Sequence, residues 1–153
     1  MVLFLLMYIC SLQSLVSIDD PLTGINNRRQ LFTYLSYKIK YLDKNERLYF
    51  ILLDIDMFKR INNTYVHNEG DKAIVIVENA LREMCRKTNG FCARYGGDEF
   101  AFVQTLNSGA RINAFVKKIT SDIQHAAKAP GILHPIDISV LCAGYKNVTF
   151  DIQ

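Results

Sequence analysis

Residues 91–106 read Phe-Cys-Ala-Arg-Tyr-Gly-Gly-Asp-Glu-Phe-Ala-Phe-Val-Gln-Thr-Leu, and this stretch decides the fold. A short apolar run, Phe91 to Arg94, precedes the turn residues Gly96-Gly97-Asp98-Glu99, and a second apolar run, Phe100 to Leu106, follows them. Two such runs joined by a glycine-rich turn predict a β-hairpin, because glycine adopts the backbone angles of tight turns without steric cost. We therefore expect two adjacent antiparallel strands with two carboxylates at the turn that joins them.

Two further strands are expected outside the hairpin. Residues 48–53 form a continuous apolar run that is too short for a helix and typical of a buried strand, and residues 136–143 form a similar run near the C-terminus. The first run ends on Asp54-Ile55-Asp56, so that Asp54 and Asp56 share one face of the sheet if the strand persists.

Three helices are expected between these strands. Apolar residues recur every three or four positions in residues 28–42, 70–87 and 112–126. Asn27, with Gln30 three residues later, predicts the start of the first helix. Residues 59–71 form a polar stretch before the second helix.

Apart from the first helix, the order is β-α-β-β-α-β. A right-handed crossover makes the first two strands parallel and leaves room for a third between them, which the hairpin fills. The chain is therefore predicted to be an α+β, palm-like (ferredoxin-like) domain with a central antiparallel sheet. In this topology the end of the first strand, at Asp54, lies beside Asp98 and Glu99 at the start of the third.

Carboxylates are thereby expected at one edge of the sheet. Like charges raise one another's pKa, so such a group is unfavourable without a cation, and Mg²⁺ usually binds one or two carboxylates together with substrate phosphates. Taken singly, Asp54 is more simply explained as a cap of the strand end and Asp98-Glu99 as a charged hairpin tip; together they favour a metal site. Gly96 and Gly97 lack Cβ atoms where a phosphate could approach backbone N–H groups.

The same residues carry a family resemblance. Residues 94–100, Arg-Tyr-Gly-Gly-Asp-Glu-Phe, resemble the signature of the GGDEF domain, the diguanylate cyclases. Three more segments resemble family motifs in the right order: residues 20–29 the first motif, residues 54–59 with 61–64 the metal and phosphate segment, and residues 67–71 the base-recognition segment. The resemblance covers about residues 19–145.

The resemblance implies a role for each matching residue. Asp54, the Ile55 carbonyl and Asp98 would bind Mg²⁺, with Mn²⁺ as an alternative ion. Phe58 and Lys59 would form the triphosphate cradle, and Asn62, His67 and Asp71 belong to the guanine-recognition segments. Glu99 would activate the 3′-hydroxyl or complete the metal site. For Lys59 a solvated surface lysine, and for Asn62 and His67 a bracing role in the turn, stay open as alternatives.

The implied reaction condenses two GTP into cyclic di-GMP with release of two pyrophosphates. Each domain would hold one GTP, so the active species would be a homodimer. The rival hypothesis is a non-catalytic GTP-binding or dimerising signalling module. Two departures from the family pattern favour this module: Val66 where glycine is usual, and a chain that stops soon after the last strand, without the usual C-terminal helix. A third departure, Asn63 where aspartate is common, removes a charge but not a named ligand.

Another departure concerns product binding. Many family members carry an Arg-x-x-Asp pair that binds the product, and the corresponding positions here are Lys87 and Gly90. Lysine lacks the planar fork of arginine, and glycine has no side chain that could accept a hydrogen bond. We expect no high-affinity product site at this surface.

Composition limits the classes of protein that the chain can represent. Its 153 residues suffice for one domain, 50% of them are hydrophobic, and Lys plus Arg (18) exceeds Asp plus Glu (15) by three. No basic cluster larger than a pair such as Arg28-Arg29 occurs, which argues against nucleic-acid binding. The four cysteines, Cys10, Cys85, Cys92 and Cys142, form no CxxC pair and lie in apolar runs, which predicts buried reduced thiols in a cytoplasmic protein.

The N-terminus differs from the rest. Residues 1–18 carry no charge, a length that is borderline for a membrane span. Three interpretations stay open: the stub of a membrane anchor, a packing or dimerising helix, and a cropped gene start. If the segment inserts, Arg28 and Arg29 would hold the domain of residues 19–153 at the inner face of the cytoplasmic membrane.

Overall fold

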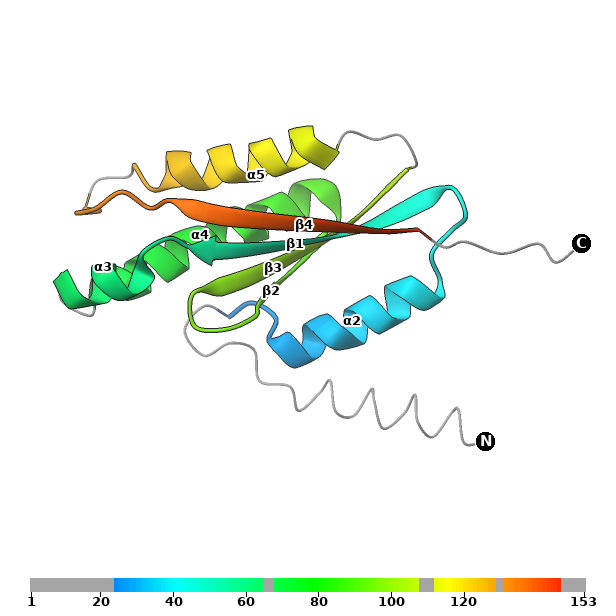
Figure 1. Ribbon diagram of the computed structural model, residues 1–153, viewed down its shortest axis with the longest axis horizontal. Helices are drawn as coiled ribbons and strands as arrows, with labels where there is room; N and C mark the ends of the chain where they lie inside the picture. The colour runs from blue at the N-terminus through cyan, green and yellow to red at the C-terminus, as the bar shows by residue number, and fades with distance from the viewer. Residues whose placement is uncertain (1–23, 65–67, 108–111, 129–130, 147–153) are drawn as a thin grey trace, which may run out of the picture.

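The computed structural model describes residues 24–64, 68–107, 112–128 and 131–146 (Figure 1). In chain order the elements are α2 (Arg28–Lys40), β1 (Glu46–Ile55), α3 (Phe58–Thr64), α4 (Asn68–Thr88), β2 (Phe91–Arg94), β3 (Glu99–Asn107), α5 (Ile112–Ala126) and β4 (Ile138–Lys146). The predictions for residues 1–18, Val66 and His67 lie outside the described residues. Within the described part of the chain, no helix is long and apolar enough to cross a bilayer.

The four strands form one antiparallel sheet in the order β2-β3-β1-β4. β1 is central, pairing with β3 from Asp54↔Glu99 to Glu46↔Asn107 and with β4 from Ile55↔Ile138 to Arg47↔Lys146. β3 lies between β1 and β2, so that β1 and β2 run parallel, as the β-α-β-β-α-β order predicts. The expected α+β fold is confirmed.

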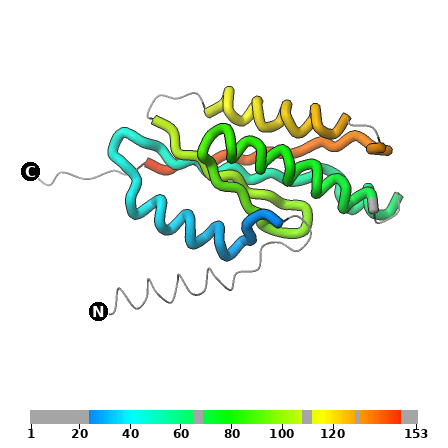
Figure 2. The backbone as a smooth tube through the Cα atoms, turned by 180° about the vertical axis from the view of Figure 1, so that it is seen from behind, coloured from blue at the N-terminus to red at the C-terminus, as the bar shows by residue number. Residues whose placement is uncertain are grey.

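Helices cover both faces of the sheet: α4 and α5 lie on one face and α2 on the other (Figure 1, Figure 2). The larger core cluster joins β1 to α4 and α5 through Ile51, Leu53, Val77, Leu81, Ile119 and Ile123. The smaller cluster joins the other face to α2 through Leu31, Leu48, Ala101 and Val103. Successive side chains of a strand point to opposite faces, so β1 reads as a continuous apolar run because both of its faces are covered.

The start of α2 is fixed as the sequence predicts. The Asn27 side chain accepts a hydrogen bond from the Gln30 backbone N–H at 3.0 Å, and the Gln30 side chain accepts one from the Asn27 N–H at 2.6 Å. This reciprocal capping box satisfies two N–H groups that have no partner within the helix. The preceding residue, Asn26, bridges to Ala93 of β2 and ties the beginning of the helix to the hairpin.

The polar stretch at 59–71, to which the sequence pattern assigns no element, contains most of a short helix. This helix is α3, whose one buried side chain is Ile61, and α4 then begins at Asn68 instead of residue 70. A helix of seven residues presents too few apolar positions to produce a recognisable period. The added helix matters because it directly follows the end of β1.

The last strand also differs from its prediction. β4 runs from Ile138 to Lys146 instead of over residues 136–143, because its pairing with β1 continues to Arg47↔Lys146. Cys142 lies in this strand and is exposed, which contradicts the expectation that it is buried.

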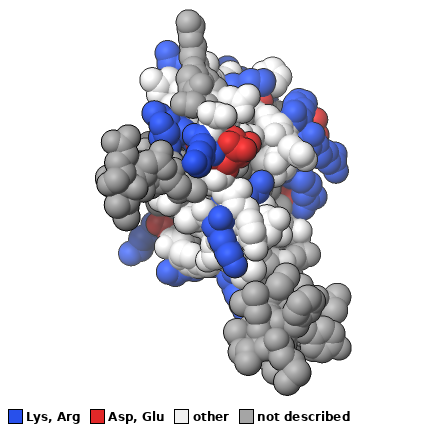
Figure 3. All heavy atoms as spheres, turned by 90° about the vertical axis from the view of Figure 1, so that its right-hand side faces the viewer, with Lys and Arg blue, Asp and Glu red and all other residues white. Residues whose placement is uncertain are grey.

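Charge is unevenly distributed over the surface. Figure 3 shows the end of the molecule where β1 begins, and Lys and Arg side chains dominate the charged groups there and are spread over that face. The carboxylates that end β1 lie at the opposite end of the same strand.

Candidate functional site

The end of β1 and the start of β3 form the centre of the candidate site. Asp54 stands opposite Glu99 in the β1–β3 register, and the Ile55 backbone N–H donates to the Asp98 carbonyl at 3.2 Å. Asp54, Ile55, Asp98 and Glu99 are therefore adjacent, although the two pairs are far apart in the sequence. This is the juxtaposition that the strand order predicts.

The electrostatics of this edge reflect the crowding of carboxylates. The pKa of Asp54 is raised, first by its partial burial and then by the negative charges of Asp98, Glu99 and Asp56. A group of oxygen donors with excess negative charge is the chemistry that Mg²⁺ or Mn²⁺ prefers. Asp54, Asp98 and the Ile55 carbonyl thus fit a divalent cation that takes further ligands from a substrate. Among the described residues, no three His, Cys, Asp or Glu side chains are placed to form a complete metal site on their own.

Asp56 is held by β4. Asp56 was expected to share the face of Asp54 if the strand continued that far. β1 ends at Ile55, so Asp56 is not a strand residue. Its backbone N–H donates to the Asp137 carbonyl at 2.9 Å, and its carboxylate accepts a hydrogen bond from the Ser139 hydroxyl at 2.6 Å. These contacts occupy Asp56 with the neighbouring strand.

The two glycines of the turn have different surroundings. A Cβ atom on Gly96 would lie 2.7 Å from the Glu99 carboxylate, whereas a Cβ on Gly97 would meet nothing within 4 Å. Gly96 thus lets the Glu99 side chain pack against the backbone of the turn. Gly97 is the position where the backbone stays open to a ligand.

Arg94 braces this turn, a role that sequence reasoning missed. Its guanidinium donates to the Gly97 carbonyl at 2.7 Å from Nη2 and to the Gly96 carbonyl at 3.2 Å from Nε. The signal in the sequence is an arginine two residues before a Gly-Gly turn, since its side chain is long enough to reach back over the turn.

The first turn of α3 follows directly from the carboxylate edge. Met57 joins β1 to α3 with φ 56, a left-handed conformation that is uncommon outside glycine and marks a tight change of direction. Phe58 is half-buried and packs against the larger core cluster, whereas Lys59 is exposed. Phe58 thus anchors the start of α3, and Lys59 extends into solvent beside it.

The predicted guanine-recognition residues lie on α3 and α4. Asn62 of α3 is half-buried and packs against Gly70 of α4, where a Cβ atom would collide with the Asn62 side chain. Asp71 follows Gly70 and is exposed in the first turn of α4. Asn62 therefore lies against the turn of α4 that carries Asp71, while His67 lies outside the described residues.

A buried carboxylate that is not among the predicted site residues lies in the first turn of α4. Glu69, only 5% exposed, bonds Lys72 Nζ at 2.6 Å, and its other oxygen lies 3.5 Å from the Leu133 N–H and 3.7 Å from His134 Nε2. We call Glu69, Lys72, Leu133 and His134 the Glu69 cluster. It joins the α5–β4 loop to the helix that carries Asp71.

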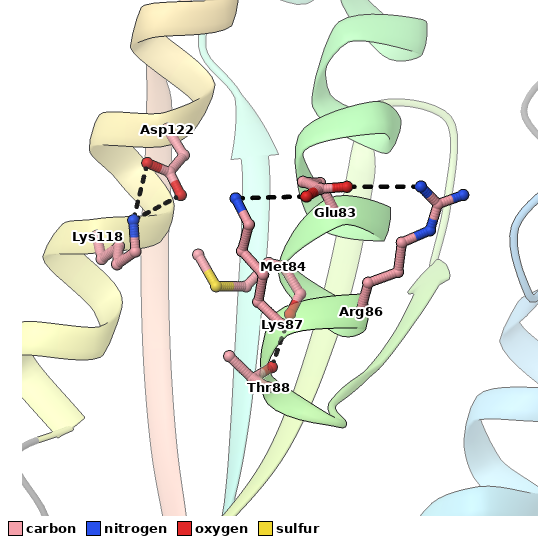
Figure 4. A network of polar contacts seen from close by, with 7 residues as sticks. All are labelled: Glu83, Met84, Arg86, Lys87, Thr88, Lys118 and Asp122. Carbon is pink, nitrogen blue, oxygen red and sulfur yellow. Dashed lines mark hydrogen bonds and ion pairs between the residues drawn. The ribbon is translucent and has the colours of Figure 1, made fainter.

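Lys87 and Gly90, the two positions at which we expect no product site, make other contacts in the fold. Lys87 is paired with Glu83 at 3.4 Å, and Glu83 also contacts Arg86, all three on the surface of α4 (Figure 4). A Cβ atom on Gly90 would lie 2.5 Å from the Phe102 ring. The fold therefore has no room for a carboxylate at position 90 without moving a buried aromatic side chain.

Comparisons with known proteins point to one family. A sequence model described as "Diguanylate cyclase, GGDEF domain" matches residues 17–152. The chain is 32% identical over 112 residues to the probable diguanylate cyclase DgcJ of Escherichia coli K12, covering 72% of this chain and 22% of that protein. It is 41% identical over 94 residues to the diguanylate cyclase DgcP of Pseudomonas aeruginosa, covering 60% of this chain and 14% of that protein.

The fold agrees with these matches. The crystal structure of the GGDEF domain of DgcB from Caulobacter crescentus, in complex with c-di-GMP, superimposes with a TM-score of 0.72 at 26% identity, covering 85% of this chain and 78% of that one. The chain spans less than a quarter of the length of DgcJ and of DgcP.

Proposed function

We propose a function from the premise that this chain belongs to the GGDEF domain family, which the match over residues 17–152 establishes. The function is that of a diguanylate cyclase, which condenses two GTP into cyclic di-GMP and releases two pyrophosphates. The observation that carries the proposal is the pairing of Asp54 with Glu99, which places carboxylates of β1 and of the β2–β3 turn at one edge of the sheet.

In this proposal Asp54, Asp98 and the Ile55 carbonyl hold Mg²⁺, or Mn²⁺ in its place. When bound, the cation neutralises phosphate charge and orients the triphosphate. The residues are oxygen donors only, and they are adjacent through the β1–β3 register and the hydrogen bond between Ile55 and Asp98. Two carboxylates leave coordination positions for phosphate oxygens.

The triphosphate is bound by the segment that follows β1 and by the turn. Phe58 fixes the start of α3 through its core contacts, and exposed Lys59 offsets charge on the phosphates. The open backbone at Gly97, next to Gly96, gives phosphate oxygens access to N–H groups. Positioning and charge stabilisation account for most of the rate in phosphoryl transfer, so residues without a chemical step still control turnover.

Glu99 accepts the proton of the attacking 3′-hydroxyl, or else would complete the set of residues that hold the metal. Its carboxylate packs against Gly96, in a turn that Arg94 holds through two carbonyls. A fixed turn supports this role, because a general base works only within hydrogen-bond reach of the proton it removes.

Asn62 and Asp71, with His67 of the same segment, recognise guanine. A carboxylate accepts from the base N–H groups, and an amide both donates and accepts, a combination suited to guanine. The contact between Asn62 and Gly70 supports the assignment, because it sets the Asn62 amide beside the helix turn that carries Asp71.

The reaction needs two GTP, so we propose a homodimer as the active unit. We also propose that residues 1–18 form an apolar segment that precedes the domain of residues 19–153. The domain then works in the cytoplasm, at the inner face of the membrane if that segment inserts.

Incubation of the chain with GTP and Mg²⁺, followed by nucleotide chromatography, tests the proposal. We expect cyclic di-GMP, loss of MgGTP binding in Asp54→Asn and Asp98→Asn, and weak competition by ATP. Asp122→Asn is the matched control, because Asp122 is an acid on the surface of α5 that pairs only with Lys118 among the contacts of the described residues. Binding of MgGTP without product would favour the signalling module, and unchanged MgGTP binding in Asp54→Asn or Asp98→Asn would contradict the shared metal site.

A further inference from the structure

Two cysteines meet in a cavity on the side of the molecule formed by α4 and β2. Cys85 of α4 is half-buried and Cys92 of β2 is 5% exposed. Both line a cavity of about 230 Å³, together with Gly24, Ile25, Asn26, Arg82, Gly90 and Phe91. Only Asn89 and Gly90 separate α4 from β2, so this short connection turns the two side chains toward the same space.

The two thiols line the same cavity and affect each other's protonation. Hydrogen bonding between them raises the pKa of Cys85 and lowers that of Cys92. Burial and the Glu78 carboxylate oppose the lowering of the Cys92 pKa, and the Arg82 guanidinium, which is paired with Glu78, supports it. Cys92 is therefore the more acidic thiol of the pair, and Cys85 is the thiol that keeps its proton.

The backbone on the strand side holds this arrangement in place. The Asn26 side chain donates to the Cys92 carbonyl at 2.8 Å, and the Arg94 N–H donates to the Asn26 carbonyl at 2.8 Å. Cys92 also belongs to the larger core cluster, and Cys85 packs against that cluster. Hydrogen bonds of the backbone thus fix the place of Cys92, and packing against the same core cluster fixes that of Cys85.

We propose that Cys85 and Cys92 form a reversible disulfide site that is closed by a hydroperoxide. The sulfur of Cys92 attacks one peroxide oxygen, which gives a sulfenic acid at Cys92 and, from hydrogen peroxide, one water. The sulfur of Cys85 then attacks the sulfenic sulfur, the S–S bond forms, and the hydroxyl leaves as a second water with the proton of Cys85. Two thiols are oxidised by two electrons, one peroxide is reduced, and a small-molecule dithiol reopens the bond by exchange.

The cavity supplies what such a site needs besides the two thiols. It lets a molecule of the size of peroxide reach Cys92, although that side chain is almost fully buried. Cys142 provides an internal comparison, because it is exposed on β4 and lies in a different element. If exposure alone governed oxidation, Cys142 would react before the pair.

The site can be tested on the full chain by mass spectrometry. The reduced protein is treated with hydrogen peroxide, free thiols are alkylated, and the protein is digested with trypsin. Cleavage after Arg82, Arg86, Lys87 and Arg94 yields the peptides Glu83–Arg86 and Thr88–Arg94, each of which contains one cysteine of the pair. We expect these two peptides joined, lighter than their sum by two hydrogens, and separated again by dithiothreitol.

Two comparisons make the test decisive. The rate of closure in the folded protein should exceed that in the urea-unfolded chain by about tenfold or more, because the fold holds the sulfurs together. The double variant Cys10→Ser/Cys142→Ser should keep the joined peptides, and Cys85→Ser should lose them and stop at a sulfenic acid on Cys92. Closure no faster than in urea, or oxidation of Cys142 while Cys85 and Cys92 stay free, would overturn the proposal.

Discussion

Asp54, the proposed metal ligand at the end of β1, is crowded by other carboxylates. Its pKa is raised by partial burial and by the nearby carboxylates, so the folded state holds the Asp54 proton more tightly than the unfolded state does. The protonated Asp54 carboxyl therefore contributes stability that is fully present below the pKa of Asp54 in the unfolded chain. This contribution is lost as pH rises through the pKa of Asp54 in the folded protein. At neutral pH without metal, the ionised Asp54 destabilises the protein.

We predict that Asp54→Asn raises the thermal midpoint of the metal-free protein at neutral pH. The gain should correspond to at most about 1 kcal/mol, because the carboxylate is partly solvated and its repulsions are screened. Thermal melts in EDTA measure this gain. Melts in Mg²⁺ measure the stabilisation by the metal, which should raise the midpoint of the parent and leave that of the variant unchanged. A variant that melts lower than the parent in EDTA would show that Asp54 makes favourable contacts in the metal-free fold.

Gly96 and Gly97 form a matched pair for a second prediction. Alanine at 96 places a Cβ against the Glu99 carboxylate, whereas alanine at 97 meets open space. Gly96→Ala should cost less than about 1 kcal/mol of folding free energy, because the Cβ meets only the flexible end of a side chain, but it should displace the Glu99 carboxylate. Gly97→Ala should fold like the parent.

Chemical denaturation and turnover measurements check this difference. In Gly96→Ala the turnover number should fall by about tenfold or more, with a smaller change in GTP affinity, because a displaced base affects the chemical step most. Turnover in Gly96→Ala equal to that of the parent would mean that Glu99 has room to move.

At the scale of whole elements, the Glu69 cluster fixes the first turn of α4. The pKa of Glu69 is lowered, first by the hydrogen bond from Lys72, despite an opposing effect of burial. A lowered carboxylate pKa contributes stability that is present above the unfolded value, near 4.5, and is lost as pH falls through the folded value. The cluster should therefore stabilise α4 at neutral pH and fail in acid.

We predict that Glu69→Gln lowers the thermal midpoint by several degrees at neutral pH, with the loss shrinking below about pH 4. Glu83→Gln is the matched control on the same helix, because Glu83 is exposed and its pairs with Arg86 and Lys87 are surface contacts. Melts of both variants from pH 3 to pH 8 measure the effect. A loss that is the same at every pH would assign the effect to packing of the side chain instead of its charge.

The elements differ in how well the sequence predicts them. The hairpin, β1, α5 and the Asn27 cap follow from local patterns, because each depends on residues that are close in the chain. α3 was missed because seven residues give no clear period, and the extent of β4 was wrong because it is set by pairing with β1. The carboxylate edge was predicted from strand order. The contacts of Glu69 with Leu133 and His134 were not, because they join residues that are far apart in the sequence.

The junction of α4 and β2 gives a prediction about feedback. Lys87 is paired with Glu83, and Gly90 faces Phe102 without room for a side chain. Loss of a charged hydrogen bond typically lowers affinity by about ten- to a hundredfold, and here one partner is absent and the other weakened. Calorimetric titration with cyclic di-GMP should find no tight site at this surface. A submicromolar site that disappears in Lys87→Ala would contradict this prediction.

At the scale of the whole molecule, the helices leave part of the sheet uncovered. Leu141 of β4 is 69% exposed and Tyr145 is 43% exposed. Both stand opposite β1 residues of the face that α2 covers, since Leu141 pairs with Leu52 and Tyr145 with Leu48, and cross-strand partners share a face. α2 contacts β2 and does not extend its cover to this edge of the sheet. The described domain therefore presents apolar side chains along β4, from Leu141, two residues after the Ser139 that pairs with Asp54, to Tyr145 near the opposite end of the strand.

The last prediction concerns the number of chains that turnover requires. Each domain is proposed to hold one GTP through Asp54 and Asp98, and cyclic di-GMP contains two guanosine units, so two loaded chains must meet. Mixing parent with an equal amount of Asp54→Asn at fixed total concentration leaves about one quarter of random pairs fully loaded, against about one half of single chains. Activity should therefore fall toward a quarter, and specific activity should rise with protein concentration. A fall only to one half, with specific activity independent of concentration, would mean that one chain completes the reaction alone.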